Sequence, residues 1–146
     1  MKVYFDTCCY CRSQDDQKQE RIRLETRAIM TAIEECRIAG HSIVGSDALT
    51  FELGDIRDPG KREHVEAFFV DTIDSHIAIT EETICKAQLF IEIGMDAMDS
   101  VHLAATDSAG IDYLITTDDN FIKIAAGLST MTKVINPITF LREVMR

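Results

Sequence analysis

The residues that could carry chemistry are acidic and are spread along the chain. Asp6 ends an apolar run, and the carboxyl ends of parallel strands are where ligands collect. Glu52 follows a second apolar run, in a segment where Ser46 or Asp47 could cap a helix. Carboxylates that converge suit Mg²⁺ or Mn²⁺, which can activate a water molecule and offset the charge of a phosphate. Taken singly, Asp6 could equally be a turn or cap residue, and Glu52 a solvated helix residue.

Two further acidic pairs leave the choice of residue open. Asp96 and Asp99 stand three residues apart at a predicted helix start, where carboxylates also act as caps and dipole partners. Asp118 and Asp119 follow a predicted strand and could cap the next helix. His102, one turn after Asp99, could move protons or orient a site, although packing inside a helix is the commoner role of such a histidine. Spacing alone does not choose within either pair.

The elements that must position these residues alternate between strands and helices. This alternation predicts an α/β domain with a mainly parallel sheet. The predicted strands cover residues 2–6, 41–45, 77–79, 113–116 and 133–135. The 146 residues have the length of one ordinary domain and contain no linker, repeat or low-complexity segment. We therefore expect a single domain over residues 1–146.

Helices are predicted between the strands. A long amphipathic helix should follow the first strand and end at Gly40. Its apolar positions are Ile22, Ile29, Ile33 and Cys36. Two successive helices, over 81–93 and from about residue 97 to Gly110, should bridge the third and fourth strands.

The last helix and one loop complete the expected elements. Asn136 should cap the C-terminal helix and Pro137 should begin it. Its predicted apolar stripe is Ile138, Leu141 and Met145. Around residues 58–61, turn-forming residues are dense and apolar periodicity lapses, so we expect a mobile connection that contacts a substrate or partner.

The charge balance argues against a general binder of polyanions. The chain has 15 basic and 25 acidic residues, a net charge of -10, which predicts weak affinity for RNA in the absence of metal. Two divalent ions at a site of four carboxylates would offset four of these negative charges. Arginines at the start of the long helix could steer phosphates or simply be solvated, and we leave them outside the site. They are Arg12, Arg21, Arg23 and Arg27.

Cysteine usage and the absence of targeting signals indicate a cytoplasmic protein. Five cysteines are an odd number, and the proximity of Cys8, Cys9 and Cys11 favours free thiols over disulfides. We expect these three to pack beside Asp6 without a catalytic role. The four histidines lack the spacing of a zinc site. No signal peptide or apolar stretch of membrane-spanning length is evident, so we expect no membrane association.

The order of the acidic residues resembles that of the PIN-domain family of VapC-like ribonucleases. The family pattern is an Asp after the first strand, a later Glu, an Asp in a helix and a Thr-x-Asp. The opening FDTCCYCR over residues 5–12, followed by Asp15, Asp16 and Gln17, resembles a subgroup with an Asp-Thr-Cys-Cys start. The resemblance spans nearly the whole chain. It implies a PIN-like three-layer α/β/α sandwich with a mainly parallel five-stranded sheet.

The resemblance also implies a site and an activity. It resolves both acidic pairs and gives, as catalytic residues and metal ligands, Asp6, Glu52, Asp99 and Asp118, with Thr116 as a supporting hydroxyl. Glu52 would be either a further ligand or an orienter of the attacking water. The implied protein is an endoribonuclease that uses Mg²⁺ or Mn²⁺ and hydrolyses RNA. Many such proteins are toxins of toxin-antitoxin pairs, so an antitoxin protein is the expected partner, with a homodimer as another expected assembly.

Three other classes compete with this interpretation. A catalytically silent PIN-type module would bind RNA or protein without cleavage. An aspartate-nucleophile phosphatase and a phospho-acceptor receiver also place an Asp after the first strand of a doubly wound sheet. The phosphatase requires Asp-x-Asp, whereas this chain has Cys8 at the second position, and the receiver requires an acidic pair before its acceptor.

Overall fold

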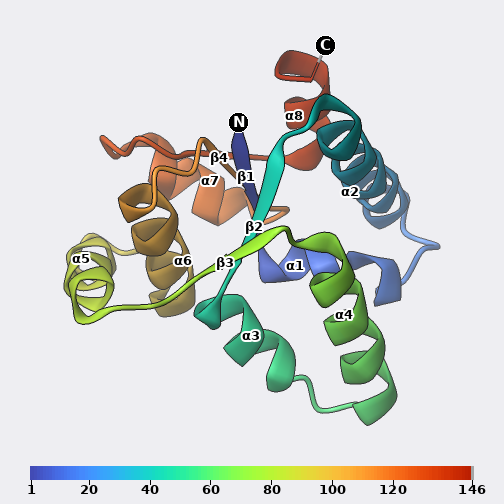
Figure 1. Cartoon of the computed structure of the whole chain (residues 1–146), viewed down its shortest axis with the longest axis horizontal. Coiled ribbons are helices and arrows are strands. Elements are labelled where there is room, and N and C mark those ends of the chain that lie inside the picture. The colour runs from blue at the N-terminus through green and yellow to red at the C-terminus, as the bar shows by residue number, and fades with distance from the viewer. Residues whose placement is uncertain (146) are drawn as a thin grey trace.

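One parallel sheet organises the computed structural model, which describes residues 1–145 (Figure 1). The strand order is β3-β2-β1-β4-β5, and every neighbouring pair is parallel. The strands are β1 (Lys2–Phe5), β2 (Ser42–Ser46), β3 (Ser75–Ile77), β4 (Tyr113–Ile115) and β5 (Lys133–Ile135). The strand order reverses between β1 and β4, and ligands bind at such a switch point beyond the carboxyl ends of the strands.

Helices cover both faces of the sheet (Figure 1). The helices are α1 (Thr7–Cys11), the short 3-10 helix η1 (Arg12–Gln14), α2 (Glu20–Ala39), α3 (Asp47–Gly54), α4 (Pro59–Thr72), α5 (Glu81–Glu92), α6 (Ala97–Ser108), α7 (Asp119–Ala126) and α8 (Pro137–Glu143). In Figure 1, α2, α4 and α8 lie to the right of the sheet, and α5, α6 and α7 lie to its left. Helix α3 contacts both α4 and α6. Within residues 1–145, no helix is long and apolar enough to cross a membrane.

The central strand is buried on both faces. Tyr4 and Phe5 are each 0% exposed, as expected for a parallel strand that helices cover on both sides. Phe5 packs edge-on against Tyr10 of α1, and Tyr10 packs edge-on against Phe69 of α4. The ring centroids are 6.4 and 5.1 Å apart. These contacts fix the end of β1, and therefore the position of Asp6.

The predicted helix boundaries are largely confirmed. Helix α2 ends at Gly40, whose φ of 74° is left-handed and suits glycine. Helices α5 and α6 are followed by Gly94 and Gly110, which also have positive φ. The Ser46 side chain accepts a hydrogen bond from the Leu49 amide and caps α3. Local sequence is therefore sufficient to end these helices, because the capping groups and the left-handed residues lie within one turn of each boundary.

Three predictions about elements are wrong. Residues 58–61 are the start of α4, not a mobile connection, because the Asp58 carboxylate accepts bonds from the Gly60 and Lys61 amides and Pro59 takes the first turn. The third strand is Ser75–Ile77 instead of residues 77–79, because β2 pairs with Ser75 and the two residues that follow it. The prediction followed the apolar run over residues 77–79, which lies mostly after the three residues that pair with β2.

The third error concerns α8. Asn136 caps it and Pro137 begins it, as predicted. Its fully buried residues are Pro137 and Phe140. Leu141 and Met145 of the predicted stripe pack against the core and are partly buried, so the error is confined to Ile138, which is 41% exposed. Phe140 packs edge-on against Tyr113 of β4, with ring centroids 5.5 Å apart. The sheet beneath the helix, and not the helix period alone, decides which side chains are buried.

We predict that Phe140→Ala lowers the free energy of unfolding by about 3–5 kcal/mol, because it opens a cavity between α8 and the sheet. Ile138→Ala, on the exposed side of the same helix, should change that free energy by less than about 1 kcal/mol. Urea denaturation of the two variants measures both values. Equal losses would contradict the observed orientation of α8.

Candidate metal centre

Asp6 stands at the carboxyl end of the central strand and is 5% exposed. Its amide donates to the carbonyl of Ile115 on β4 at 2.9 Å. One carboxylate oxygen, Oδ1, accepts the Thr7 amide at 2.8 Å and caps α1. The other, Oδ2, accepts the hydroxyl of Thr116 at 2.8 Å. Asp6 is therefore both a helix cap and a fixed carboxylate at the switch point of the sheet.

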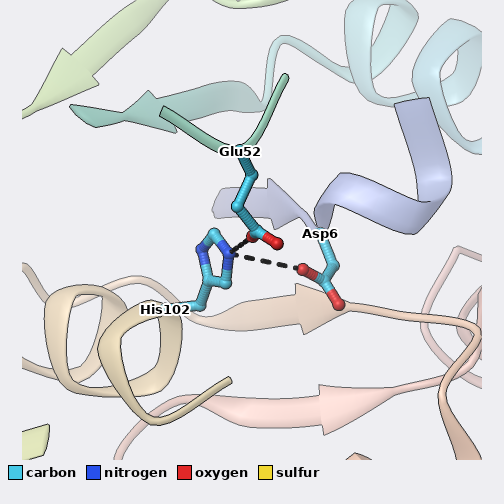
Figure 2. A group of neighbouring side chains, drawn as sticks. All are labelled: Asp6, Glu52 and His102. Atoms are coloured by element: carbon cyan, nitrogen blue, oxygen red, sulfur yellow. Dashed lines mark hydrogen bonds and ion pairs between the residues drawn. The ribbon is translucent and has the colours of Figure 1, made fainter. Parts of the chain in front are cut away.

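Glu52 and His102 complete a compact cluster with Asp6 (Figure 2). His102 Nε2 makes a very short contact with Glu52 Oε1 and lies 3.7 Å from Asp6 Oδ1. Each residue offers a ligand atom, and these atoms all lie within 4.8 Å of one another. Thr7 Oγ1 donates to Glu52 Oε1 at 2.7 Å. Glu52 is therefore a fixed residue of the cluster and not a freely solvated helix glutamate.

A chain of polar groups runs from this cluster into the core. His102 Nδ1 lies 2.5 Å from the hydroxyl of Tyr4, which lies 2.7 Å from Ser46 Oγ. Burial alone lowers the pKa of His102, but the bond to Glu52 and the charge of Asp6 outweigh it and hold that pKa above its ordinary value. In the protonated imidazole both ring nitrogens donate, one to Glu52 and one to Tyr4. His102⁺ is then the internal counter-ion of the two carboxylates.

The same pairing with His102 also changes the pKa of Glu52. Burial raises the pKa of Glu52, but the hydrogen bond and the charge of His102 and the hydroxyl of Thr7 bring it below its ordinary value. Glu52 is therefore ionised at neutral pH. A packed helix histidine was the expected role of His102, and this residue is indeed 0% exposed, yet its ring contacts the cluster directly.

Asp99 lies in the first turn of α6 and is half-buried. Burial, followed by the negative charges of Asp6 and Asp118, raises the pKa of Asp99 to about 7. The cap of α6 is instead Asp96, whose Oδ2 accepts the Met98 amide at 3.2 Å. The structure thus separates the two members of this pair. Asp96 caps the helix, and Asp99 is the residue on which the negative charges of Asp6 and Asp118 act.

Asp118 combines a capping role with a place beside the cluster. Its Oδ1 accepts the amides of Asn120 and Phe121 at 3.0 and 3.1 Å and caps α7. Its own amide donates to Thr116 Oγ1 at 3.2 Å, which joins it to the residue that holds Asp6. Asp119, by contrast, is turned toward Arg21 and is not part of this arrangement. Asp118 is exposed, so solvent reaches this residue, whereas Asp6 and His102 are buried.

The donor set fits a divalent cation. Two carboxylates provide ligand oxygens close together, and the imidazole of His102 could add Nε2 once it has lost its proton. Asp99 and Asp118 add negative charge beside them. Oxygen ligands with one imidazole nitrogen are suited to Mn²⁺ and, through the carboxylates, to Mg²⁺. A bound cation would also offset the repulsion that raises the pKa of Asp99. The residues present therefore form a candidate metal centre.

Cysteines border this centre as free thiols. Cys8 Sγ lies 3.6 Å from Asp6 Oδ2 and 3.4 Å from Thr116 Oγ1. Cys9 is buried, and its thiol donates to the Ile115 carbonyl at 3.3 Å. Burial raises the pKa of Cys9 and brings that of Cys11 to about 11. These two thiols are therefore protonated at neutral pH and poor nucleophiles.

Sequence reasoning missed three supporting residues. Tyr4 lies two positions before Asp6, and since alternate strand residues share a face, its orientation toward α6 could have been inferred. Thr7 and Ser46 were visible only as helix-terminal residues. Their second bonds, to Glu52 and to Tyr4, cross between elements that are distant in sequence. No local pattern signals such contacts.

Comparison with known proteins supports the fold. No protein-family model matches the sequence, and no curated protein sequence matches it. Among solved structures, the chain is similar to VapBC2 from Rickettsia felis, determined bound to a DNA fragment from the promoter of these proteins. The TM-score is 0.62 and the identity 9%, over 92% of this chain and 98% of that one. The PIN-like α/β fold, with its parallel sheet of five strands flanked by helices, is therefore confirmed.

We predict that Asp99→Asn stabilises the metal-free protein at pH 8 but not at pH 5. A carboxyl whose folded-state pKa is raised from 3.8 to about 7 binds its proton more tightly in the folded than in the unfolded state. Its contribution to stability is therefore lost as the pH rises from 4 to 7. The gain at pH 8 should be of the order of 2 kcal/mol, because each pKa unit corresponds to about 1.4 kcal/mol and solvent screening reduces the total.

Urea denaturation in EDTA at both pH values measures this gain. The raised pKa of His102 makes wild-type stability fall in the same direction, so the comparison is between wild type and variant at each pH. Asp71→Asn, at an exposed position of α4, is the matched control and should show no such difference. Equal destabilisation of Asp99→Asn at both pH values would instead assign this residue a structural role.

Proposed function

We propose that this protein is a metal-dependent endoribonuclease of the PIN type that acts in the cytoplasm. The observation that carries the proposal is the cluster of Asp6, Glu52 and His102 at the carboxyl end of the parallel sheet. Asp99 lies beside it, and burial together with the negative charges of Asp6 and Asp118 raises the pKa of Asp99. The likeness of the fold to VapBC2 supports it. The proposed catalytic residues are Asp6, Glu52, Asp99 and Asp118, with Thr116 in support.

The chain's own residues would hold the centre in a defined geometry. Asp6, Glu52, Asp99 and Asp118 would bind Mg²⁺ or Mn²⁺ directly or through water. When bound, the metal would supply an activated water and offset the charge of the scissile phosphate. Thr116 orients the carboxylate of Asp6, and Thr7 orients that of Glu52. These fixed carboxylates could accept hydrogen bonds from a water molecule and so orient it.

Strand order argues against the receiver alternative. Receiver domains have the order 2-1-3-4-5, whereas this sheet has 3-2-1-4-5. The catalytically silent module remains the competing proposal, because it would share both fold and acidic cluster. It differs in one measurable property, since it would bind RNA without cleaving it.

We further propose a protein partner that covers the acidic centre. The similar solved structure is of VapBC2. By analogy, this chain would be the toxin of a toxin-antitoxin pair, with an antitoxin that blocks the centre, and a homodimer is a second proposed assembly. The net charge of -10 makes a partner with a basic segment the natural complement.

We expect the protein to cleave a fluorescently labelled single-stranded or structured RNA in Mg²⁺ or Mn²⁺ and to lose this activity in EDTA. Asp99→Asn should eliminate cleavage, because it removes one of the charges that bind the cation. Asp71→Asn should cleave like the wild type. Undiminished cleavage in excess chelator would refute metal dependence, and binding without cleavage would select the silent module.

We predict that Cys8→Ser and Cys9→Ser leave turnover nearly unchanged. Serine keeps a hydrogen-bonding group at Cys8, and the raised pKa of Cys9 makes it a poor nucleophile. Steady-state kinetics of the folded variants provides the test. A loss of more than about a hundredfold in kcat would require a thiol mechanism in place of the metal mechanism.

A further inference from the structure

A buried carboxylate lies outside the acidic cluster, behind the loop that carries Asp118. It belongs to Glu25 of α2, which is 1% exposed. Its Oε1 lies 3.6 Å from Arg12 Nη2, and its Oε2 lies 3.5 Å from Arg21 Nε. Oε2 also accepts from Asn136 Nδ2 at 3.1 Å. A buried carboxylate is costly unless it is paired, and this one is paired with two guanidinium groups.

Both arginines extend from Glu25 to the loop between β4 and α7. Arg12 Nη2 donates to Thr117 Oγ1 in a very short contact. Arg21 Nη2 donates to the Thr117 carbonyl at 3.3 Å. Its Nη1 and Nη2 also donate to the two carboxylate oxygens of Asp119, both at 2.9 Å. The loop is therefore held from two sides by cations that share Glu25 as a common partner. Each cation has a second acidic partner, because Arg12 Nη1 lies 3.1 Å from Asp15 Oδ2 and Arg21 pairs with Asp119.

This loop carries two groups of the candidate metal centre. Thr116, immediately before Thr117, donates to Asp6. Asp118, immediately after it, provides one of the charges that act on Asp99. A shift of Thr117 would thus move both groups relative to Asp6. Of the four arginines that the sequence analysis left outside the site, Arg12 and Arg21 pair with Glu25 and donate to Thr117, even though the Arg21 side chain is 58% exposed.

We propose that Glu25 is a positioning residue for the metal centre, acting through Arg12 and Arg21 on the loop that carries Thr116 and Asp118. The inference rests on the metal centre of the proposed function. Partners of this kind orient the groups that contact a metal, and their loss typically weakens metal binding by about 10- to 100-fold. Glu25 itself contacts none of the acids of the cluster among the interactions of residues 1–145.

The test is the affinity of Glu25→Gln for Mn²⁺, measured by isothermal titration calorimetry on the full chain. We expect binding about tenfold weaker than in the wild type. Amide hydrogen exchange at residues 117–119 of the metal-free variant should also be faster, because the arginines lose their shared anion. Glu34→Gln, an exposed position on the same helix, makes the same charge change and should leave both measurements unchanged.

Two other variants separate positioning from folding. Arg21→Gln removes a 58% exposed side chain and should preserve the fold while weakening Mn²⁺ binding and loosening the loop. Asn136→Ala removes the bond from Glu25 to the cap of α8, so it should lower the melting temperature with little change in Mn²⁺ affinity. Wild-type Mn²⁺ affinity and loop exchange in folded Glu25→Gln, or in Arg21→Gln should Glu25→Gln not fold, would overturn the inference.

Failure of the proposed ribonuclease function can be distinguished from failure of the proposed role of Glu25. A wild type that binds Mn²⁺ but cleaves no RNA would refute the ribonuclease and leave the comparison of Glu25→Gln intact. A wild type that does not bind Mn²⁺ would overturn both, because there would be no metal centre to position.

Discussion

Repulsion between carboxylates gathered at one end of the sheet is the constraint on which this structure depends. Burial, together with the negative charges of Asp6 and Asp118, raises the pKa of Asp99 to about 7. Such an arrangement costs folding free energy, so the positions of the acids must be imposed by the rest of the fold. Hydrogen bonds from neighbouring threonines and backbone amides hold these acids in place. Thr116 holds Asp6, and helix-terminal amides hold Asp118. The rigid parallel sheet supplies the common edge.

His102 is the group of the protein that reduces that repulsion. Its protonated ring can neutralise part of the charge of Glu52 and Asp6, and the hydroxyl of Tyr4 fixes its other nitrogen. A divalent cation bound to the same carboxylates would provide this compensation more strongly. The centre therefore has one charge-balancing group of its own and the geometry to accept another. This is a physical reason for a histidine buried in the core beside acids.

A second set of charged groups lies outside the acidic cluster, in a chain that is strongly acidic overall. Arg12 and the largely exposed Arg21 both pair with Glu25 and connect α2 to the loop after β4. The same loop joins Thr116 to Asp6 across the centre of the sheet. The position of α2 and the position of the loop that carries Thr116 and Asp118 are thus linked through ion pairs and hydrogen bonds. A shift in one would be transmitted to the other.

The sequence by itself determined much of the secondary structure. Apolar runs located β1, β2, β4 and β5 to within one residue at each end, because a strand covered on both faces must be apolar along its length. Glycines and capping residues located the ends of α2, α5 and α6, because these signals act within one helical turn. The start of α4 was misjudged, since an Asp-Pro-Gly sequence suits both a turn and a helix N-terminus.

Only the tertiary structure decided how the acids are used. Sequence spacing left the members of both acidic pairs as equal candidates, because each could cap a helix, and only the family resemblance favoured Asp99 and Asp118. Their separation depends on residues from other elements, such as Arg21, which binds Asp119. The choice between the two roles offered for His102 and the burial of Glu25 likewise depended on the tertiary structure. Local preferences act over a few residues, whereas the electrostatic environment of a side chain is set by groups that folding brings together from the whole chain.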